Sequence, residues 1–243
     1  MKFKLITAID RINYFSDNFI SYYKRFFLPE EFYFLVHDVN APQIISYLKS
    51  HGFTNSDIEV YVSSKFGWGD NINRQNSVKK RFIDEGYTVL YADVDERIFH
   101  PDLRNFILNT PGDWIAPTGI SLMQHSSEPP LDETRKVLEQ RSYGKIDTYW
   151  FSKTCILRKD FEWLPGRHTR PTQLAINPHI YLIDIGKACK DLMLRNNEES
   201  KRIYKNVFWR YSTDKKEAFN QVFEEHKGPL VRLPSMIINS NLF

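Results

Sequence analysis

Two aspartates stand close together immediately after a short apolar segment of the sequence. Residues 88–92 are Thr-Val-Leu-Tyr-Ala, and Asp93, Val94 and Asp95 follow them directly. If the extended backbone continues here, residues two positions apart lie on one face, so the two carboxylates converge and Val94 points away. Converging carboxylates repel each other unless a cation joins them, and hard oxygen ligands select Mg²⁺ or Mn²⁺. The spacing predicts a divalent metal site, although an acidic turn that ends a strand would show the same pattern.

The segments that must position Asp93 alternate between strand and helix patterns. Short apolar runs predict strands at residues 3–9, 32–37, 58–62 and 88–92. Amphipathic runs between them predict helices at residues 14–27, 41–51 and 73–84. This alternation predicts an α/β fold with a doubly wound, mostly parallel sheet and helices on both faces. Such sheets bind ligands beyond the carboxyl ends of their strands, where Asp10, Asp38 and Asp93 stand.

The second half of the sequence has a less regular pattern. Strands are expected at residues 114–117, 148–157 and 179–185, and a long connection carries a helix at 131–141. Basic amphipathic segments predict one or two helices at 189–226. We therefore expect one domain at 1–188, made of halves at 1–100 and 101–188, with a helical extension at 189–243 packed on it.

The composition indicates a folded protein and excludes several classes. Of the 243 residues, 42% are hydrophobic and 15% aromatic, which excludes intrinsic disorder. A net charge of +3 without an aromatic and basic strand motif argues against nucleic acid as a partner. Cys155 and Cys189 cannot form a disulfide framework or a zinc site. Since no apolar stretch approaches about 18 residues and the N-terminus lacks a signal-peptide pattern, we expect a cytoplasmic location.

Three further motifs stand in a fixed order around the aspartates. The segment 73–78 opens the helix before them, Lys153 and Arg158 bracket a Lys-x-x-Ile-x-Arg strand, and a turn at 166–168 reads Gly-Arg-His. Over about residues 3 to 186, this order resembles the nucleotide-sugar glycosyltransferases of the GT-A fold, in their family-2-like and family-92-like branch. The resemblance implies a nucleotide-binding first half and an acceptor-binding second half.

The resemblance also implies an activity and a set of roles. The activity is transfer of a hexosyl or deoxyhexosyl group from a nucleotide-diphosphate-sugar to a hydroxyl of a glycan or lipid-linked glycan, as in polysaccharide biosynthesis. Mn²⁺ or Mg²⁺ would be the cofactor, with Asp93, Asp95 and His168 as its ligands. The residues that would contact the nucleoside or neutralise the diphosphate are Asp38, Arg74, Asn76, Lys153, Arg158 and Arg167.

An inverting transferase also needs a carboxylate base beside the acceptor hydroxyl. In the family that this sequence resembles, the base lies between the paired aspartates and the histidine turn. The candidates here are Glu128, Asp132, Glu133, Glu139 and Asp147. We favour Asp147, which directly precedes Thr148. Aromatic side chains could pack against the sugars, although such residues more often form the core; they are Trp68, Trp114, Tyr149 and Trp150.

Simpler structural roles compete with several of these assignments. Asp38 could cap the helix that starts near Ala41, and His168 could be an ordinary structural histidine. The basic residues in and after the Lys-x-x-Ile-x-Arg strand could be solvated surface charges. The basic helices at 189–226 could contact an acidic membrane surface or present a solvated face.

Two other classes of function also fit the paired aspartates. A metal-dependent nuclease or phosphotransferase would need further carboxylates converging on Asp93, and Asp10 is the best candidate. A noncatalytic nucleotide-binding or glycan-binding module would bind a nucleoside diphosphate with Mn²⁺ but transfer nothing.

Overall fold

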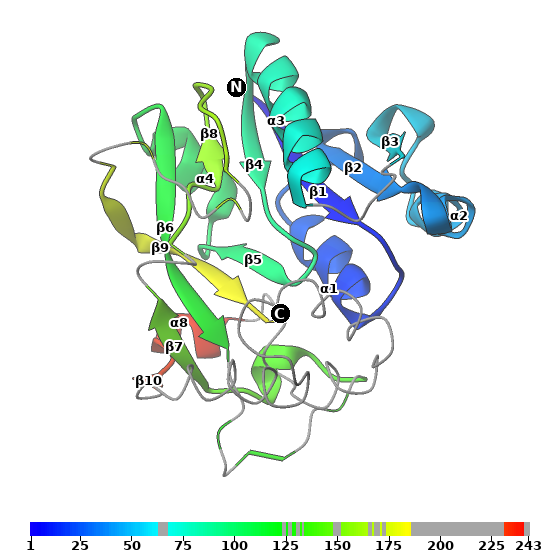
Figure 1. Ribbon diagram of the computed structural model, residues 1–243. Coiled ribbons are helices and arrows are strands. Elements are labelled where there is room, and N and C mark those ends of the chain that lie inside the picture. Colours follow the sequence, from blue (N-terminus) through cyan, green and yellow to red (C-terminus); the bar gives the residue numbers. More distant parts are fainter. Residues whose placement is uncertain are drawn as a thin grey trace, which may run out of the picture. The chain divides into compact units, whose positions relative to one another are not determined.

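The computed structural model in Figure 1 describes most of the chain. The described positions are 1–62, 68–122, 125, 128–129, 132, 134–147, 152–164, 167, 171, 174–185 and 231–240. The chain divides into two compact units. Unit 1 comprises mainly Met1–Gly119 and Asp147–Ile183, and unit 2 comprises mainly Ile120–Ile146 and Asp184–Asn241.

Six strands of unit 1 pair side by side in the order β6-β8-β4-β1-β2-β3. Their bounds are β1 Lys2–Ile9, β2 Phe32–His37, β3 Ile58–Tyr61, β4 Tyr87–Tyr91, β6 Trp114–Leu122 and β8 Ile156–Leu157. Strands β4, β1, β2 and β3 are parallel, whereas β8 runs antiparallel to both β4 and β6. In addition, β5 (Glu96–Phe99) pairs with β9 (Ile176–Asp184), which also pairs with β6. The predicted parallel core is confirmed.

The register of the parallel strands brings their carboxyl ends to one edge of the sheet. His37 of β2 lies opposite Tyr61, the last residue of β3. Ile6 of β1 lies opposite Tyr91, the last residue of β4. The aspartates that follow β1, β2 and β4 therefore stand along a shared edge, called the carboxyl edge below.

Helices cover both faces of this sheet. They are α1 Tyr14–Tyr23, α2 Ala41–Ser50, α3 Trp68–Asp84 and α4 Leu103–Asn109, with short 3₁₀ turns η1 Pro29–Glu31, η2 Asp38–Asn40 and η3 Asn55–Asp57. Helix α3 crosses β4 and β1 in Figure 1 and packs on the face that carries Tyr33. The opposite face carries Phe34 and Phe3, which contact Phe53 after α2 and Phe27 after α1. The predicted α/β class with helices on both faces is confirmed.

Two of the predicted helices have different ends in the structure. Helix α1 begins after Asn13, whose side chain accepts hydrogen bonds from the N–H groups of Phe15 and Ser16 at 3.0 and 3.2 Å. It ends at Tyr23 instead of residue 27, and turns continue the chain. Helix α3 begins at Trp68, before the predicted residue 73, and ends at Asp84 as predicted.

The helix predicted at 131–141 is wrong within the described residues of that segment. A turn precedes η4 (Val137–Glu139), and no longer helix forms there in the described part. The reason is the buried side chain of Gln140. Its Oε1 accepts from the N–H of Asp132 at 2.7 Å, and its Nε2 donates to the carbonyl oxygens of Asp132 and Lys136 at 2.9 and 3.2 Å. One side chain thus satisfies backbone groups that a helix would otherwise pair.

The strand predicted at 148–157 is also mostly wrong in the part that can be described. Strand β7 (Tyr143–Asp147) ends just before it, residues 152–155 have no regular structure, and only Ile156–Leu157 form β8. The strands predicted at 114–117 and 179–185 are confirmed as parts of β6 and β9. The helices predicted at 189–226 lie outside the described residues.

Unit 2 contains β7, η4, the end of β6 and a short C-terminal segment. Strand β10 (Val231–Arg232) pairs antiparallel with β7, and α8 (Ser235–Ile238) follows it. Gly144 allows a close approach in β7, because a Cβ there would lie 2.9 Å from the Ser121 carbonyl oxygen. In the described ranges of both units, no helix has the length and apolar character needed to cross a membrane.

Candidate functional site

The segment that contains the paired aspartates is a turn. The N–H of Glu96 donates to the carbonyl oxygen of Asp93 at 2.8 Å, and the N–H of Asp93 donates to Glu96 Oε2 at 3.0 Å. Val94 and Asp95 occupy the middle of this turn. The expectation that extended backbone places Asp93 and Asp95 on one strand face is therefore wrong, because the Glu96 side chain closes the segment into a turn.

Two cations from distant parts of the sequence converge on Asp93. Lys153 Nζ lies 2.5 Å from Glu96 Oε1 and 3.5 Å from Asp93 Oδ2. A guanidinium nitrogen of Arg167 donates to the same Oδ2. The side chains of Lys153 and Glu96 are 3% and 4% exposed, whereas that of Asp93 is 33% exposed. These four residues form the Asp93 cluster, in which two carboxylates balance two cations.

Arg167 is held in place by three further features. Its second guanidinium nitrogen donates to Gln75 Oε1 at 2.6 Å, and the guanidinium carbon lies 4.1 Å from the centre of the Tyr91 ring. Its backbone has a φ of 56°, in the left-handed region that side chains other than glycine seldom adopt. The guanidinium is thus oriented by a helix, a strand and a constrained backbone.

Helix α3 fixes the segment that leads to Arg167. The side-chain amide of Asn76 exchanges two hydrogen bonds with the backbone of Trp163, at 2.8 and 2.9 Å. Lys79 pairs with Asp160 at 2.8 Å and donates to the carbonyl oxygen of Phe161. The Trp163 ring is buried in the core beneath α3. Residues one turn apart on α3 therefore hold the segment on which Arg167 stands.

The charges of the cluster determine its pKa values. Burial alone would raise the pKa of Asp93, but Arg167 and Lys153 outweigh burial and lower the pKa to about 2. Burial would lower the pKa of Lys153, but Glu96 and Asp93 raise it above its ordinary value. In the same way, Asp93 outweighs burial and raises the pKa of Arg167. At neutral pH, Asp93, Lys153 and Arg167 are therefore all charged.

A second group of polar residues lies at the ends of β1, β2 and β3. The Asp10 carboxylate pairs with Arg11 at 2.9 Å, and Asp38 Oδ1 lies 3.2 Å from Nδ1 of His37. The pKa of Tyr61 is raised to about 12, mainly by burial and to a smaller extent by the charges of Asp10 and Asp38. We call these five residues the Asp38 region. The capping role considered for Asp38 gains no support, because the residue at the N-cap of α2 is Asn40.

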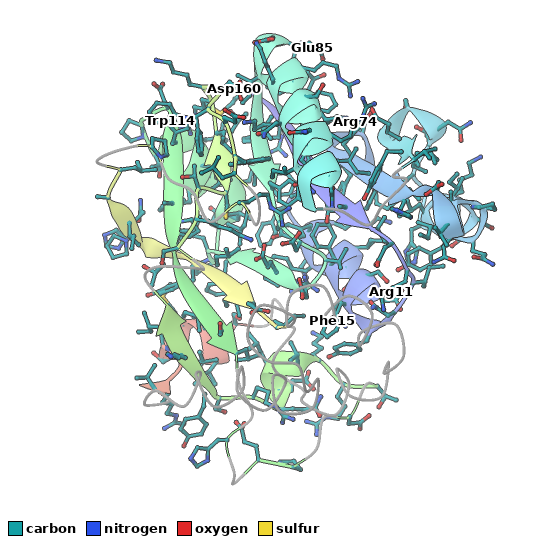
Figure 2. All side chains as sticks on the ribbon, in the orientation of Figure 1. Arg11, Phe15, Arg74, Glu85, Trp114 and Asp160 are labelled. Atoms are coloured by element: carbon teal, nitrogen blue, oxygen red, sulfur yellow. The ribbon has the colours of Figure 1, made fainter. Side chains whose placement is uncertain are left out.

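Three side chains that were expected at the donor site instead form contacts with other residues of unit 1. Arg74 pairs with Glu59 of β3, and Figure 2 shows it beside α3. Asn76 is used by Trp163, as described above. The Arg158 guanidinium donates to the carbonyl oxygen of Ile107, within α4, at 2.5 Å. The structure does not bring these three side chains to the Asp93 cluster.

Trp114 also lies away from the carboxyl edge. It is opposite Leu157 in β8, which is opposite Val89 in β4. Val89 precedes Asp93 by about 13 Å of extended strand, at roughly 3.3 Å per residue. Figure 2 accordingly shows Trp114 near Asp160, far from Arg11 after β1. The Trp114 indole donates to the carbonyl oxygen of Lys159 at 2.7 Å, which accounts for its position without a sugar.

The other predicted residues are only partly described. Asp147 ends β7, and its side chain, like that of Trp68, is outside the described part. His168, Glu133, Tyr149 and Trp150 also lie outside the described residues. The remaining candidate bases, Glu128, Asp132 and Glu139, are in unit 2. Glu128 accepts hydrogen bonds from the N–H groups of His125 and Ser142. Asp132 accepts one from the N–H of Thr134, and Glu139 is exposed beside Arg135.

Two residues of the site were missed from the sequence. Glu96 follows the paired aspartates directly, and its place three residues after Asp93 suits a side chain that accepts from the Asp93 N–H. This spacing was a usable signal. Gln75 offers none, because its contact with Arg167 joins residues 92 positions apart.

A divalent ion at this turn would need oxygen atoms that the two cations leave accessible. Asp93 Oδ2 faces Lys153 and Arg167, whereas Oδ1 has a 3.4 Å contact with the Tyr91 hydroxyl. Among the described residues, no three His, Cys, Asp or Glu side chains group so that they could hold an ion. Mg²⁺ commonly uses one or two carboxylates and completes its shell with water and substrate phosphates. Asp93 Oδ1 is the carboxylate oxygen that the two cations leave for such an ion, and an ion shared with Asp95 remains a prediction.

The chain was also compared with known proteins. No protein family and no curated protein sequence matches it. It is similar to the crystal structure of S. aureus TarS, with a TM-score of 0.41 and 16% identity over 93% of this chain and 43% of TarS. It is less similar to WbbM, described as a bifunctional glycosyltransferase, with a TM-score of 0.28 and 10% identity over 82% of this chain and 33% of WbbM. The chain thus spans less than half of either protein, and its function must be argued from the site.

Proposed function

We propose that this protein is a glycosyltransferase that binds the diphosphate of a nucleotide-sugar donor at the Asp93 cluster. One observation carries the proposal: a partly exposed aspartate stands beyond the carboxyl end of the parallel strand β4, with two cations directed at one of its oxygens. Ligands of doubly wound sheets bind at this edge. Because Asp93 and Glu96 already balance the two cations, an anion would bind here through a divalent ion on Asp93 and through the partly exposed guanidinium of Arg167.

The chemistry that these residues support is departure of a nucleoside diphosphate. When the bond between the sugar and the diphosphate breaks, negative charge grows on the leaving phosphate oxygens, and cations already in place stabilise it. Arg167 is the better placed of the two for contact, because its side chain is 12% exposed and that of Lys153 only 3%. A planar guanidinium also suits phosphate oxygens.

The remaining roles are proposed from the sequence pattern. A divalent ion held by Asp93 and Asp95, with His168 as a further ligand, would supply Lewis-acid stabilisation of the same phosphates. The Asp38 region would contact the nucleoside. Asp147 would remove the proton from the acceptor hydroxyl, which belongs to a glycan or a lipid-linked glycan.

The site gives less support to a nuclease or phosphotransferase. That chemistry uses several carboxylates that share metal ions. The best candidate for an additional carboxylate, Asp10, is paired with Arg11, and no group of three ligands occurs in the described part of the chain. A noncatalytic binding module would use the same cluster, so it is an outcome that the experiment must distinguish.

The proposal is tested by a thermal-shift screen of nucleoside diphosphates and nucleotide-sugars, each with and without Mn²⁺. A ligand of the native state raises the melting temperature by mass action, by about 2.7 kcal/mol of added stability at a hundred times Kd. We expect one nucleotide series to stabilise the protein, more strongly with Mn²⁺, and Asp95→Ala to remove the Mn²⁺-dependent part.

Donor turnover then separates an enzyme from a binding module. Release of the nucleoside diphosphate from the donor that binds best, with an oligosaccharide or lipid-linked acceptor present, supports the transferase. Tight binding without release or transfer supports the module. If no nucleotide or nucleotide-sugar raises the melting temperature of the wild-type protein, the proposal fails.

A further inference from the structure

Glu96 joins the Asp93 turn to Lys153. One oxygen, Oε2, accepts from the N–H of Asp93 at 3.0 Å, and the other, Oε1, lies 2.5 Å from Lys153 Nζ. Lys153 Nζ in turn lies 3.5 Å from Asp93 Oδ2. The three contacts close a ring through Asp93, Glu96 and Lys153. This ring constrains the backbone and the carboxylate of Asp93 at the same time.

Exposure separates the members of this ring. The Asp93 side chain is 33% exposed, whereas those of Glu96 and Lys153 are 4% and 3% exposed. A ligand that arrives from solvent therefore meets Asp93 before either of the other two. Glu96 and Lys153 contact Asp93 from the buried side of the site. They can therefore affect a ligand only by determining where Asp93 lies.

Arg97 fixes the same turn through the backbone. Its guanidinium donates to the carbonyl oxygens of Val94 and Glu96 at 2.9 and 2.8 Å, and to that of Phe15 at 3.2 Å. Arg97 is 1% exposed. The backbone of the turn is thus tied to the start of α1. The direction of the Asp93 carboxylate, in contrast, depends on the ring that Glu96 closes and on Arg167.

A buried ion pair of this kind is poorly explained by stability. Replacing such a pair by apolar side chains of similar volume is often neutral or stabilising, because desolvation opposes the attraction between the charges. What the pair provides at this position is orientation, since its two charged groups contact two different atoms of Asp93.

We propose that Glu96 and Lys153 form a positioning clamp, which holds Asp93 in the orientation that binds the donor diphosphate together with its divalent ion. The inference rests on the proposed function and revises one expectation in it: Lys153 acts through Asp93 and does not touch the phosphates. Residues that orient a metal-binding carboxylate typically contribute about 10- to 100-fold to affinity.

The clamp is tested by titration calorimetry. The probe is Mn²⁺ with the nucleoside diphosphate that stabilises the wild-type protein most. We expect Glu96→Gln, which keeps the shape but removes the charge, to weaken binding roughly tenfold. In an Asp93→Asn background, adding Glu96→Gln should cause no further loss, because the clamp acts only through Asp93. The double variant Glu96→Gln/Lys153→Met should bind the nucleotide at least as tightly as whichever of the two single variants, Glu96→Gln or Lys153→Met, has the lower affinity.

A conservative variant distinguishes charge from packing. Glu96→Asp keeps a carboxylate but removes a methylene, so a packing role makes it more harmful than Glu96→Gln. The clamp predicts the reverse order for affinity, with Glu96→Asp closer to the wild type. Glu31→Gln is the matched control, because it removes the carboxylate of the Glu31–Arg104 ion pair next to β2, at the end opposite the carboxyl edge. It should leave nucleotide affinity unchanged.

The outcomes separate this inference from the function on which it rests. Suppose that Asp93→Asn weakens binding. The clamp is then wrong, and the proposed function stands, if folded Glu96→Gln binds like the wild type. The same holds if Glu96→Gln lowers the affinity by the same factor in the wild type and in the Asp93→Asn background. If Asp93→Asn binds as tightly as the wild type, or the wild type binds no nucleotide, both are wrong. Where Lys153→Met alone does not fold, the double variant, which leaves neither charge buried, supplies the comparison with Glu96→Gln.

Discussion

The Asp93 cluster and the Asp38 region stand at the same edge of one sheet and differ in where their partners come from. In the Asp38 region, Asp10 pairs with Arg11 and Asp38 lies beside His37, its neighbours in sequence. Asp93 instead meets Lys153 and Arg167, 60 and 74 positions further along the chain. An aspartate after an apolar strand is thus the same sequence signal in both places. Only the partners from distant segments turn one of them into a buried, charge-balanced cluster.

The largest expected difference between the two regions is in stability. Lys153→Met leaves Glu96 buried without its cation and should lower the free energy of unfolding by about 3–5 kcal/mol. Asp10→Asn removes a partly exposed local pair and should change it by less than about 1 kcal/mol. Urea unfolding measures both. The double variant Glu96→Gln/Lys153→Met should recover most of the lost free energy of unfolding. If Lys153→Met and Asp10→Asn lower that free energy by similar amounts, the two regions do not differ in the way described.

An asparagine next to each region links two segments of the chain, and its loss should again destabilise the protein more beside the Asp93 cluster than beside the Asp38 region. Asn76→Leu removes two hydrogen bonds that hold Trp163 to α3 and should cost about 2 kcal/mol, since it leaves peptide groups unpaired. Asn40→Ala removes one bond, of 2.9 Å, to the Asp10 carbonyl oxygen and should cost about 1 kcal/mol. Chemical unfolding gives both values. An Asn76→Leu variant as stable as the wild type would show that α3 does not anchor the segment before Arg167.

Ligand specificity provides a sharper test of the two regions. If the Asp38 region contacts the nucleoside, Asp38→Ala should weaken a nucleoside diphosphate roughly tenfold, about 1.4 kcal/mol, and leave pyrophosphate unaffected. Asp93→Asn should weaken both ligands in the presence of Mn²⁺. Calorimetry with the two ligands measures the effect. Equal losses of pyrophosphate binding in the two variants would contradict the division of roles.

A further difference concerns acid. The pKa of Asp93 is lowered to about 2 from an ordinary value of 3.8, so ionised Asp93 contributes stability that is complete above pH 3.8 and is lost as the pH falls through about 2. Asp93→Asn lacks this contribution at every pH. Its free energy of unfolding should therefore decline less than that of the wild type between pH 4 and pH 2. Parallel declines in equilibrium unfolding would show that Asp93 is not paired in solution.

The parts of the fold that were predicted correctly depend on neighbouring residues. Strands β1, β2 and β4 are short apolar runs, and the turn signals beside them are local, so their positions in the chain and their parallel direction were predicted from the sequence. The helix predicted at 131–141 failed because Gln140 bonds the backbone from Asp132 to Lys136 with its side chain. A hydrophobic pattern contains no information about such a contact.

The same distinction applies to the site. Asp93 was chosen for its residue type after a strand, and Lys153 and Arg167 for their places in the motifs of the resemblance; the fold brings the three together. Arg74 and Arg158 had equally suitable types, but other acceptors hold them. Which cation reaches the aspartate is decided by the antiparallel β8 and by the segment anchored on α3, and both depend on long-range pairing that the sequence alone does not specify.

The left-handed backbone of Arg167 has a consequence for how this position tolerates change. With φ at 56°, a residue that has a Cβ is strained by about 1–3 kcal/mol there, and glycine would relieve that strain. A requirement for a firm fold alone would thus favour the smallest amino acid at this point in the chain. The arginine found here therefore costs backbone energy, and in return it places a positive charge against Asp93.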